Sequence, residues 1–571
     1  MSIALDRRDE TSAVPRPRLG LLSEGRVAVL LLGALVLFLL VAVALPLWAL
    51  LSKSFEDGAG RFVGLANYVR YFATPTLVQS LFNSLAVALV ATAIVVPLAF
   101  GYAYALTRTC MRFKGLFYAL VMLPVFAPSL LSAISFIYIF GNQGFLRAWL
   151  MGASVYGPIG IVMAQVFYCM PHAAMILVTA LSLADGRLYE AAAALGTSRA
   201  RVFRTVTLPG ARYGLISAAF VVFTLVVTDF GIPKVIGGQF GVLATDAYKQ
   251  VVGQQNFQMG AVVGMILLVP AVLAFAADRL VQKKQVSLLS ARAVPYQPRP
   301  RAGRDLAATV FCAVVGGLIA AVLGVAVWAS FIQYWPYNLS LTLGNYDFPE
   351  FDPSGWSPYL TSLQLAFAAS VIGSALVFLG AYLIEKLKVA PALRGFAQFL
   401  AMLPMAVPGL VLGLGYVFFF NARWNPLGFL YGTLGILALN TVGHFYTVAH
   451  VTAVTALKQI DGEFEAVSAS LKVPFWTTLR RVTLPICLPA ILDVAVYLFV
   501  NALTTVSAVI FLYGPSTKLA SIAIVHMDEA GSTAAAAAMA TCVVATAIAV
   551  KAVHLLLDRL VLDRLQRWRV R

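Results

Sequence analysis

Glu190 and Glu465 each begin a segment that passes through a helix of small residues and a short basic helix, and then reaches Leu-Pro and an apolar stretch. The first segment reads EAAAALGTSRARVFRTVTLP and ends at Pro209, and the second reads EAVSASLKVPFWTTLRRVTLP and ends at Pro485. The helix dipole favours a carboxylate in the early turns of a helix, and a helix of alanines can sit deep in a groove because its side chains are short. These residues predict recognition of another protein, and we find no constellation of catalytic residues.

The first segment carries the signals of two short helices joined by a tight turn. The run RLYEAAAAL is a strong helix former, and Gly196 follows where a left-handed cap would end the helix. Ser198 can cap the second helix, whose arginines stay in water until Pro209 sets the entry to the next apolar stretch. The residues expected to contact a partner are Glu190, Ala191, Ala192, Gly196, Leu208 and Pro209.

The second segment departs from this pattern. When the two Leu-Pro pairs are aligned, Ala466 occupies the position of Glu190, and the glycine position holds Lys472. We therefore expect the two segments to dock two partner copies unequally. The alternative, an amphipathic helix lying on lipid, does not explain why the arrangement recurs at the equivalent place. The residues expected to dock here are Glu465, Ala466, Lys472, Leu484 and Pro485.

A second group of polar residues lies in the apolar stretches that follow each Leu-Pro. Ionisable side chains in such stretches cost about 2.5 to 3.5 kcal/mol and are functional candidates by default. The candidates for a translocation path are Thr228, Asp229, Asn501, Thr504 and Thr505. The alternative for Asp229 is a place near the outer surface, hydrogen-bonded to the glycine-rich turn after it. Residues that could line the path, or be satisfied by neighbouring carbonyls, are Gln165, Tyr168, His172, His444 and His450.

The elements that position these residues are apolar spans. The chain has 571 residues, of which 61% are hydrophobic and 11% charged, so it has too little polar surface for a soluble protein. An apolar run of roughly 20 residues crosses a membrane. Twelve spans are expected, near residues 27–51, 78–106, 115–140, 155–182, 211–229, 259–277, 306–332, 361–384, 394–420, 429–457, 486–512 and 533–556.

The basic charge of the chain is explained by topology. The sequence has 41 Lys and Arg against 24 Asp and Glu, a net charge of +17. Most of the basic residues fall inside when both termini are placed in the cytoplasm, as the positive-inside rule requires. The charge therefore requires no nucleic-acid partner. The five cysteines form no close pair, so neither a disulfide framework nor a metal site is predicted.

The fold class predicted is an all-α polytopic membrane protein with two tandem six-span lobes. Because each lobe has an even number of spans, the two repeats run in the same direction, and a solute path is expected where they meet. The expected divisions are a cytoplasmic N-terminal tail at 1–26, a first lobe at 27–277, a cytoplasmic linker at 278–305, a second lobe at 306–557 and a cytoplasmic C-terminal tail at 558–571. The N-terminal apolar run is taken as a retained span.

The paired segments ending in Leu-Pro resemble the docking loops of bacterial type I ABC importers, and the whole chain resembles two of their permease subunits fused into one. This resemblance implies three partners beyond the bilayer of the bacterial inner membrane: two copies of a separate ATPase, and a periplasmic or lipid-anchored solute-binding protein. The sequence has no GxxxxGK[ST] phosphate loop. ATP and Mg²⁺ are therefore expected to be used by the ATPase, with no cofactor bound by this chain.

The transported solute is predicted by likeness alone. The segments VVTDFGIPKVIGG, LATDAYKQVVGQQNFQMGAV and EAVSASLKVPFW look most similar to permeases assigned to the uptake of 2-aminoethylphosphonate. The alternative within the same family is a permease for ferric iron, a polyamine or a small anion. A gradient-driven secondary transporter is the alternative from another class. Against it, the turn TRTCMRFK lacks the Gly-Asp-Arg-Gly signature of such carriers.

Overall fold

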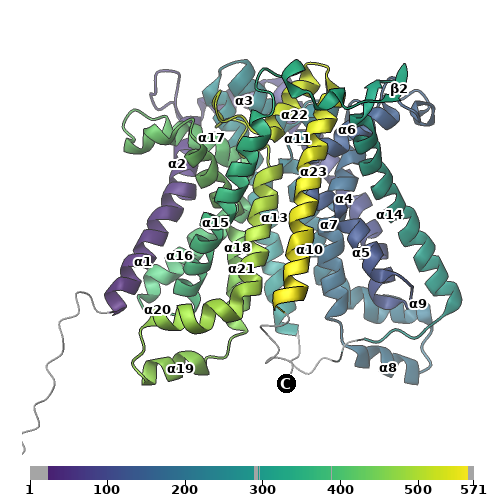
Figure 1. Ribbon diagram of the computed structural model, residues 1–571, viewed down its shortest axis with the longest axis vertical. Coiled ribbons are helices and arrows are strands. Elements are labelled where there is room, and N and C mark those ends of the chain that lie inside the picture. The colour runs from purple at the N-terminus through teal and green to yellow at the C-terminus, as the bar shows by residue number, and fades with distance from the viewer. Residues whose placement is uncertain (1–23, 289–293, 295, 388, 563–571) are drawn as a thin grey trace, which may run out of the picture.

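The computed structural model describes residues 24–288, 294, 296–387 and 389–562, and these residues form a bundle of long helices (Figure 1). This confirms the all-α polytopic fold. Among the described residues, nine helical stretches are long and apolar enough to cross a membrane. They are Gly25–Ser54 (α1, Glu24–Leu39, and α2, Leu45–Ser54), Pro75–Arg108 (α4), Pro158–Ser182 (α7), Arg199–Thr228 (α9, Arg199–Val202, and α10, Leu208–Thr228), Phe257–Val281 (within α13, Phe257–Leu288), Ala302–Ser330 (α14), Ser357–Glu385 (α15), Phe475–Thr504 (α20, Phe475–Thr478, and α21, Leu484–Thr504) and Thr533–Leu560 (with α23, Thr533–Leu557).

Two of the expected spans are bent pairs of helices. In the first half, α5 (Lys114–Met122) and a 3₁₀ turn meet α6 (Ser129–Phe140) at 101°, and in the second half α16 (Pro391–Met402) and its turn meet α17 (Gly409–Phe420) at 115°. A proline follows each bend and holds the preceding residue in an extended conformation, which interrupts the helix.

The tenth expected span is α18 (Leu434–Lys458), which is long enough to cross a membrane but does not reach the apolar composition of the others. Asn440, His444 and His450 lower its hydropathy. By length and composition the described residues therefore contain nine spans, or eleven if each bent pair is one span, where the sequence predicted twelve.

Short elements gather at the two ends of the bundle. One end, which we call the α8/α19 end, carries α8 (Gly186–Ala194), α9, α19 (Glu463–Ser470) and α20 (Figure 1). The opposite end, the α11/α22 end, carries α3 (Ala66–Ala73), α11 (Gly231–Ile236), α12 (Leu243–Tyr248) and α22 (Ala520–Glu529). It also carries a two-stranded antiparallel sheet of β1 (Ile332–Tyr334) and β2 (Asn338–Leu341). The long helices lie close together at the α11/α22 end and spread apart toward the α8/α19 end (Figure 1).

The first helix of each half packs against the other half. α1 contacts α15 and α16, and its leucines belong to a buried cluster formed with the second half. α14 in turn contacts α4, α5 and α6 of the first half. The backbones approach closely at Gly415 of α17, where a Cβ atom would lie 2.6 Å from the carbonyl oxygen of Pro46 in α2. Each half of the sequence therefore contributes one helix to the opposite side of the bundle.

The range expected for the linker, 278–305, contains the end of one helix and the start of another. α13 continues past residue 277 to Leu288, and α14 begins at Ala302, so the helical part of the connection is longer than the composition suggested. Of the tails expected at 1–26 and 558–571, residues 1–23 and 563–571 lie outside the described residues.

Candidate functional site

The expected docking helices form at the same end of the bundle, one from each half. α8 begins after Asp185, whose side chain accepts a hydrogen bond from the backbone N–H of Arg187 at 3.0 Å. Glu190 and Ala191 are exposed on α8, whereas Ala192 faces inward and is buried. Because its exposed alanine side chains are short, the surface of α8 would let a partner approach the helix backbone closely.

Both α8 and α19 end in the same left-handed turn. Gly196 has φ 64°, and the N–H of Thr197 donates to the carbonyl of Ala192 at 3.0 Å, which is the hydrogen bond expected of a glycine cap. In the second half Lys472 adopts φ 53°, and the N–H of Val473 donates to the carbonyl of Ser468 at 2.9 Å. A lysine in this conformation is strained because its Cβ crowds the backbone. The alignment that placed Lys472 at the glycine position is therefore matched by the geometry.

The short basic helices are not separate from the spans behind them. A π-helical turn at Phe203–Thr207 joins α9 to α10, and another at Leu479–Thr483 joins α20 to α21. Each continuous stretch has 30 residues, which corresponds to a rod of about 45 Å. Pro209 lies in the first turn of α10, at the entry to this span as expected, and the π-helical turn before it continues into α10 without a break.

Different side-chain contacts hold α8 and α19 to the bundle. In the second half Lys386, at the end of α15, forms an ion pair with Glu465 at 2.8 Å, and the exposed fractions of the two side chains are 10% and 26%. In the first half Arg108 ends α4, and its Nε donates to the hydroxyl of Tyr189 in α8 at 3.3 Å. Glu465 thus points into the protein, and Ala466 is the exposed residue beside it.

Glu190 has no such internal partner. It is exposed, and among the described residues it makes no hydrogen bond or ion pair. One residue along an α-helix turns a side chain by about 100°, so the shift of Glu465 by one position accounts for its inward direction. The two loops therefore offer unlike surfaces, with a free carboxylate on α8 and none at the matching place on α19.

Asp229 lies where α10 ends and joins three segments of the first half. Its Oδ2 accepts hydrogen bonds from Gln165 Nε2 of α7 at 2.9 Å and from the backbone N–H of Ile232 in α11 at 3.0 Å. The side chain of Ser129, at the start of α6, also hydrogen-bonds to it. The bond to Ile232 is the local turn contact that sequence reasoning offered as the alternative, and the bonds to Gln165 and Ser129 add a link between helices.

Asp229 lies close to the interface between the two halves. Tyr168 of α7 is near enough to interact electrostatically with both Asp229 and Tyr497 of α21. Thr505 ends α21 with nearly the same backbone angles as Asp229 and accepts a hydrogen bond from Ser521 at 2.6 Å through its carbonyl. The corresponding positions of the two halves thus carry a carboxylate and a hydroxyl.

The second half has buried polar atoms beside this position. Asn440 Nδ2 donates to the carbonyl of Ala508 at 2.6 Å. Asn440 Oδ1, Thr441 Oγ1 and His444 Nδ1 are buried without a hydrogen-bond partner. Since buried polar atoms normally have partners, these three atoms are exceptions among the described residues.

The remaining path candidates bond to their own helices. Thr228 Oγ1 donates to the carbonyl of Thr224 at 2.8 Å, and Thr504 Oγ1 donates to that of Val500 at 2.9 Å. Asn501, which is half-buried, donates to the carbonyl of Tyr497 at 2.8 Å. These contacts leave Asn501 Oδ1 and the hydroxyl lone pairs as acceptors.

At the α11/α22 end the two halves are in direct contact. Lys234 of α11 forms an ion pair with Glu529 of α22. The Lys234 ammonium lies 4.7 Å from the centroid of the Tyr248 ring, and this ring stacks at 6.1 Å on Phe511 of the other half. Sequence reasoning did not identify these residues, because neither half alone shows which side chains will face each other.

Comparison with known proteins gives a match over both halves. The sequence model of the family described as "Binding-protein-dependent transport system inner membrane component" matches residues 96–287 and 376–563. The putative ferric transport system permease protein FbpB 1 of Haemophilus influenzae is 28% identical over 444 residues, which are 74% of this chain and 69% of that protein. The ferric transport system permease protein FbpB of Actinobacillus pleuropneumoniae is 27% identical over 527 residues, 88% of this chain and 74% of the relative. The spermidine/putrescine transport system permease protein PotB of H. influenzae is 25% identical over 265 residues, 43% of this chain and 92% of that protein.

Proposed function

The chain belongs to the family of binding-protein-dependent transport system inner membrane components, and from this premise we propose that it is the permease of an ABC importer for ferric iron. Two ATPase copies would dock at α8 and α19, and a solute-binding protein would deliver the ion at the α11/α22 end. The family assignment decides against the gradient-driven carrier considered as an alternative. It also makes the chain a transport subunit that works with a separate ATPase.

The choice of ferric iron rests on the named relatives. Two ferric permeases match both halves of this chain, one of them over 88% of its length. The polyamine permease matches 43% of the chain and therefore supports the shared architecture more than the solute. The relatives reported above give no support to 2-aminoethylphosphonate, which stays a prediction from sequence likeness.

The structure suggests how docking would reach the solute path. Each continuous helix of 30 residues begins beside a docking helix and ends at Asp229 or Thr505. A push on α8 or α19 would therefore move the far end of a rigid rod, since a helix transmits an axial displacement with little deformation. Asp229 would respond most directly, because its side chain bonds to α7 and α11 as well.

The orientation in the membrane follows from the same proposal. The α8/α19 end would face the cytoplasm of a bacterium and the α11/α22 end the periplasm, with both termini inside. The arginines of α9 support this orientation, since basic residues collect on the cytoplasmic side. The contacts of Lys234 and Tyr248 would then close the periplasmic side of the path.

The decisive experiment is transport by the complete system. The chain, its ATPase and its binding protein are reconstituted in proteoliposomes, and ATP-dependent uptake is compared for ⁵⁵Fe³⁺ and for labelled 2-aminoethylphosphonate. We expect uptake of iron that requires both ATP and the binding protein. Uptake of the phosphonate without uptake of iron would overturn the ferric assignment, and uptake of either solute without the ATPase would contradict the importer mechanism.

Docking is tested separately by association with the ATPase. Glu190→Lys reverses the exposed charge on α8 and is expected to lower the amount of ATPase that co-purifies. Glu350→Lys makes the same change on an exposed residue of the α11/α22 end and serves as the matched control. Equal association of the two variants with the ATPase would exclude α8 as the docking surface.

A further inference from the structure

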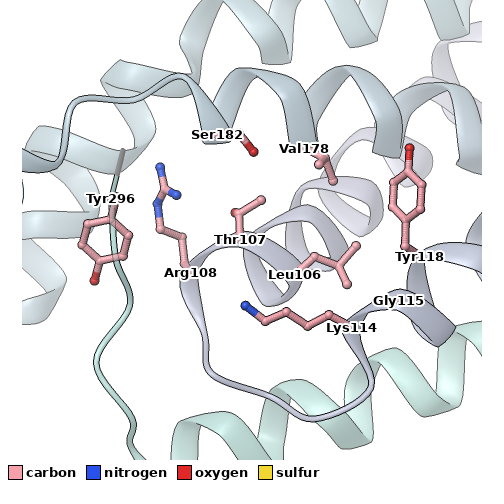
Figure 2. Close-up of a pocket in the computed structure, with 9 residues that line it drawn as sticks. All are labelled: Leu106, Thr107, Arg108, Lys114, Gly115, Tyr118, Val178, Ser182 and Tyr296. Carbon is pink, nitrogen blue, oxygen red and sulfur yellow. The ribbon is translucent and has the colours of Figure 1, made fainter. Parts of the chain in front are cut away.

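A cavity of about 490 Å³ opens between α4, α5 and α7 at the α8/α19 end, beside the chain segment that leads into α14. Figure 2 shows the polar ends of Arg108, Lys114 and Ser182 on one side of this cavity and the side chains of Leu106, Val178 and Tyr118 on the other. The lining therefore combines two cations and a hydroxyl with an apolar wall.

The two cations lack a carboxylate partner. Arg108 is 3% exposed, and no carboxylate among the described residues lies within 4 Å of it. Its contacts are the carbonyl of Leu181 at 2.5 Å, the hydroxyl of Tyr189, and the ring faces of Tyr189 and Tyr296. Lys114 is half-buried and makes no hydrogen bond or ion pair among the described residues. Arg108 is thus contacted by neutral groups, and an anion in this cavity would supply the opposite charge that stabilises a buried cation.

The backbone adds donors at the same place. Lys114 is the first residue of α5 and Gly115 the second, and the residue before them, Phe113, provides no side-chain cap. The first N–H groups of a helix point outward and favour an anion. This nine-residue helix therefore directs its N-terminus at the cavity that Lys114 and Gly115 line.

The surroundings of the cavity distinguish a lipid from a soluble anion. Phe113, Leu116 and Tyr118 are 71%, 57% and 40% exposed on or beside α5, and Leu183 is 45% exposed after α7. Such apolar side chains at the end of membrane helices contact acyl chains, whereas a free anion gains nothing from them. A phosphate joined to acyl chains satisfies both the cations and the apolar wall.

We propose that this cavity binds the phosphate headgroup of an anionic phospholipid, with Arg108 and Lys114 as counter-ions and the acyl chains lying along α5. The bound lipid would sit against Arg108, which contacts Tyr189 of the docking helix α8. In the second half the basic residue that follows α15, Lys386, is already paired with Glu465.

The test measures lipid binding to the purified full-length chain in detergent by native mass spectrometry. Phosphatidylglycerol is titrated against phosphatidylcholine, which is zwitterionic. Lys114→Gln is expected to weaken phosphatidylglycerol binding about fivefold, since one cation near a lipid surface contributes about 1 kcal/mol. Arg112→Gln removes an exposed cation that does not line the cavity and should change binding less than twofold.

A second variant tests whether misfolding, and not the lost charge, explains weaker phosphatidylglycerol binding. Gly115→Glu places a carboxylate at the cavity mouth, where no atom lies within 4 Å of the new Cβ and where an acidic residue stabilises the helix N-terminus. Its fold should be kept while phosphatidylglycerol binding falls about fivefold, since it changes the charge at the cavity by one unit, as Lys114→Gln does.

Three results would overturn the proposal. The first is equal affinity of the wild-type chain for the two lipids, and the second is unchanged phosphatidylglycerol binding in both Lys114→Gln and Gly115→Glu. The third is displacement of phosphatidylglycerol by millimolar inorganic phosphate, which would show that the cavity takes a free anion.

Discussion

The ion pair between Lys386 and Glu465 predicts how firmly α19 is held. The Lys386 Nζ and Glu465 Oε1 atoms are 2.8 Å apart, and the two side chains are 10% and 26% exposed. A surface ion pair contributes up to about 1 kcal/mol to stability, and breaking a buried pair costs about 3 to 5 kcal/mol. The partial burial of this pair places its energy between these two ranges. Glu465→Gln leaves Lys386 nearly buried without a counter-charge. We expect local opening of α19 to become easier by about 2 kcal/mol, a factor of about thirty.

Hydrogen exchange of the α19 amides in the full-length chain measures this opening. Glu463→Gln is the matched control, since Glu463 is exposed on the same helix, and it should change exchange only about twofold through the helix dipole. Adding Lys386→Met to Glu465→Gln removes the stranded cation and should restore part of the protection. The reasoning fails if Glu465→Gln exchanges like the control, or if the double variant exchanges as fast as the single one.

Three further predictions concern other contacts. Lys472→Gly relieves the left-handed strain at the end of α19 and should slow exchange of its last turn about fivefold, an effect of about 1 kcal/mol; faster exchange would contradict it. Lys234→Glu places like charges at the contact with Glu529. In the absence of the binding protein, this variant should raise the rate of ATP hydrolysis by the complex several-fold. The charge-swapped pair, Lys234→Glu with Glu529→Lys, should return the rate of ATP hydrolysis to that of the wild type. Burial alone would raise the pKa of Asp352, but hydrogen bonds from Lys518 and a backbone N–H hold this pKa below its ordinary 3.8. The stability that ionised Asp352 contributes is therefore present above pH 3.8 and is lost as the pH falls through the lowered pKa. The difference in melting temperature between the wild type and Asp352→Asn should stay constant above pH 3.8 and shrink below it.

Local signals in the sequence predicted the helices and the docking turns. The alanine run, Gly196 and the Leu-Pro pairs act within a few residues, so their geometry is encoded by neighbouring positions. The alignment placed Lys472 at the glycine position, and the structure gives it the same left-handed turn, because the turn is set by backbone hydrogen bonds that either residue type can make. The apolar stretches predicted most spans for the same reason.

Contacts between distant segments could not be predicted in this way. The partners of Asp229, namely Gln165 and Ser129, come from two other helices, α7 and α6, and hydropathy says nothing about which helices will be neighbours. The inward direction of Glu465 depends on Lys386, which lies 79 positions earlier in the chain. A closer reading of Pro128 would have suggested a break in the third span, since the residue before a proline avoids the helical region.

The exchange of α1 and α14 between the halves bears on what moves as a unit. α1 packs on α15 and α16, and α14 packs on α4, α5 and α6. If the helices of one half moved as a rigid group, the first helix of the other half would have to move with them. The packing units of this protein therefore differ from its two sequence repeats, because α1 packs with the second repeat, and α14 joins the first repeat to α23 of its own half.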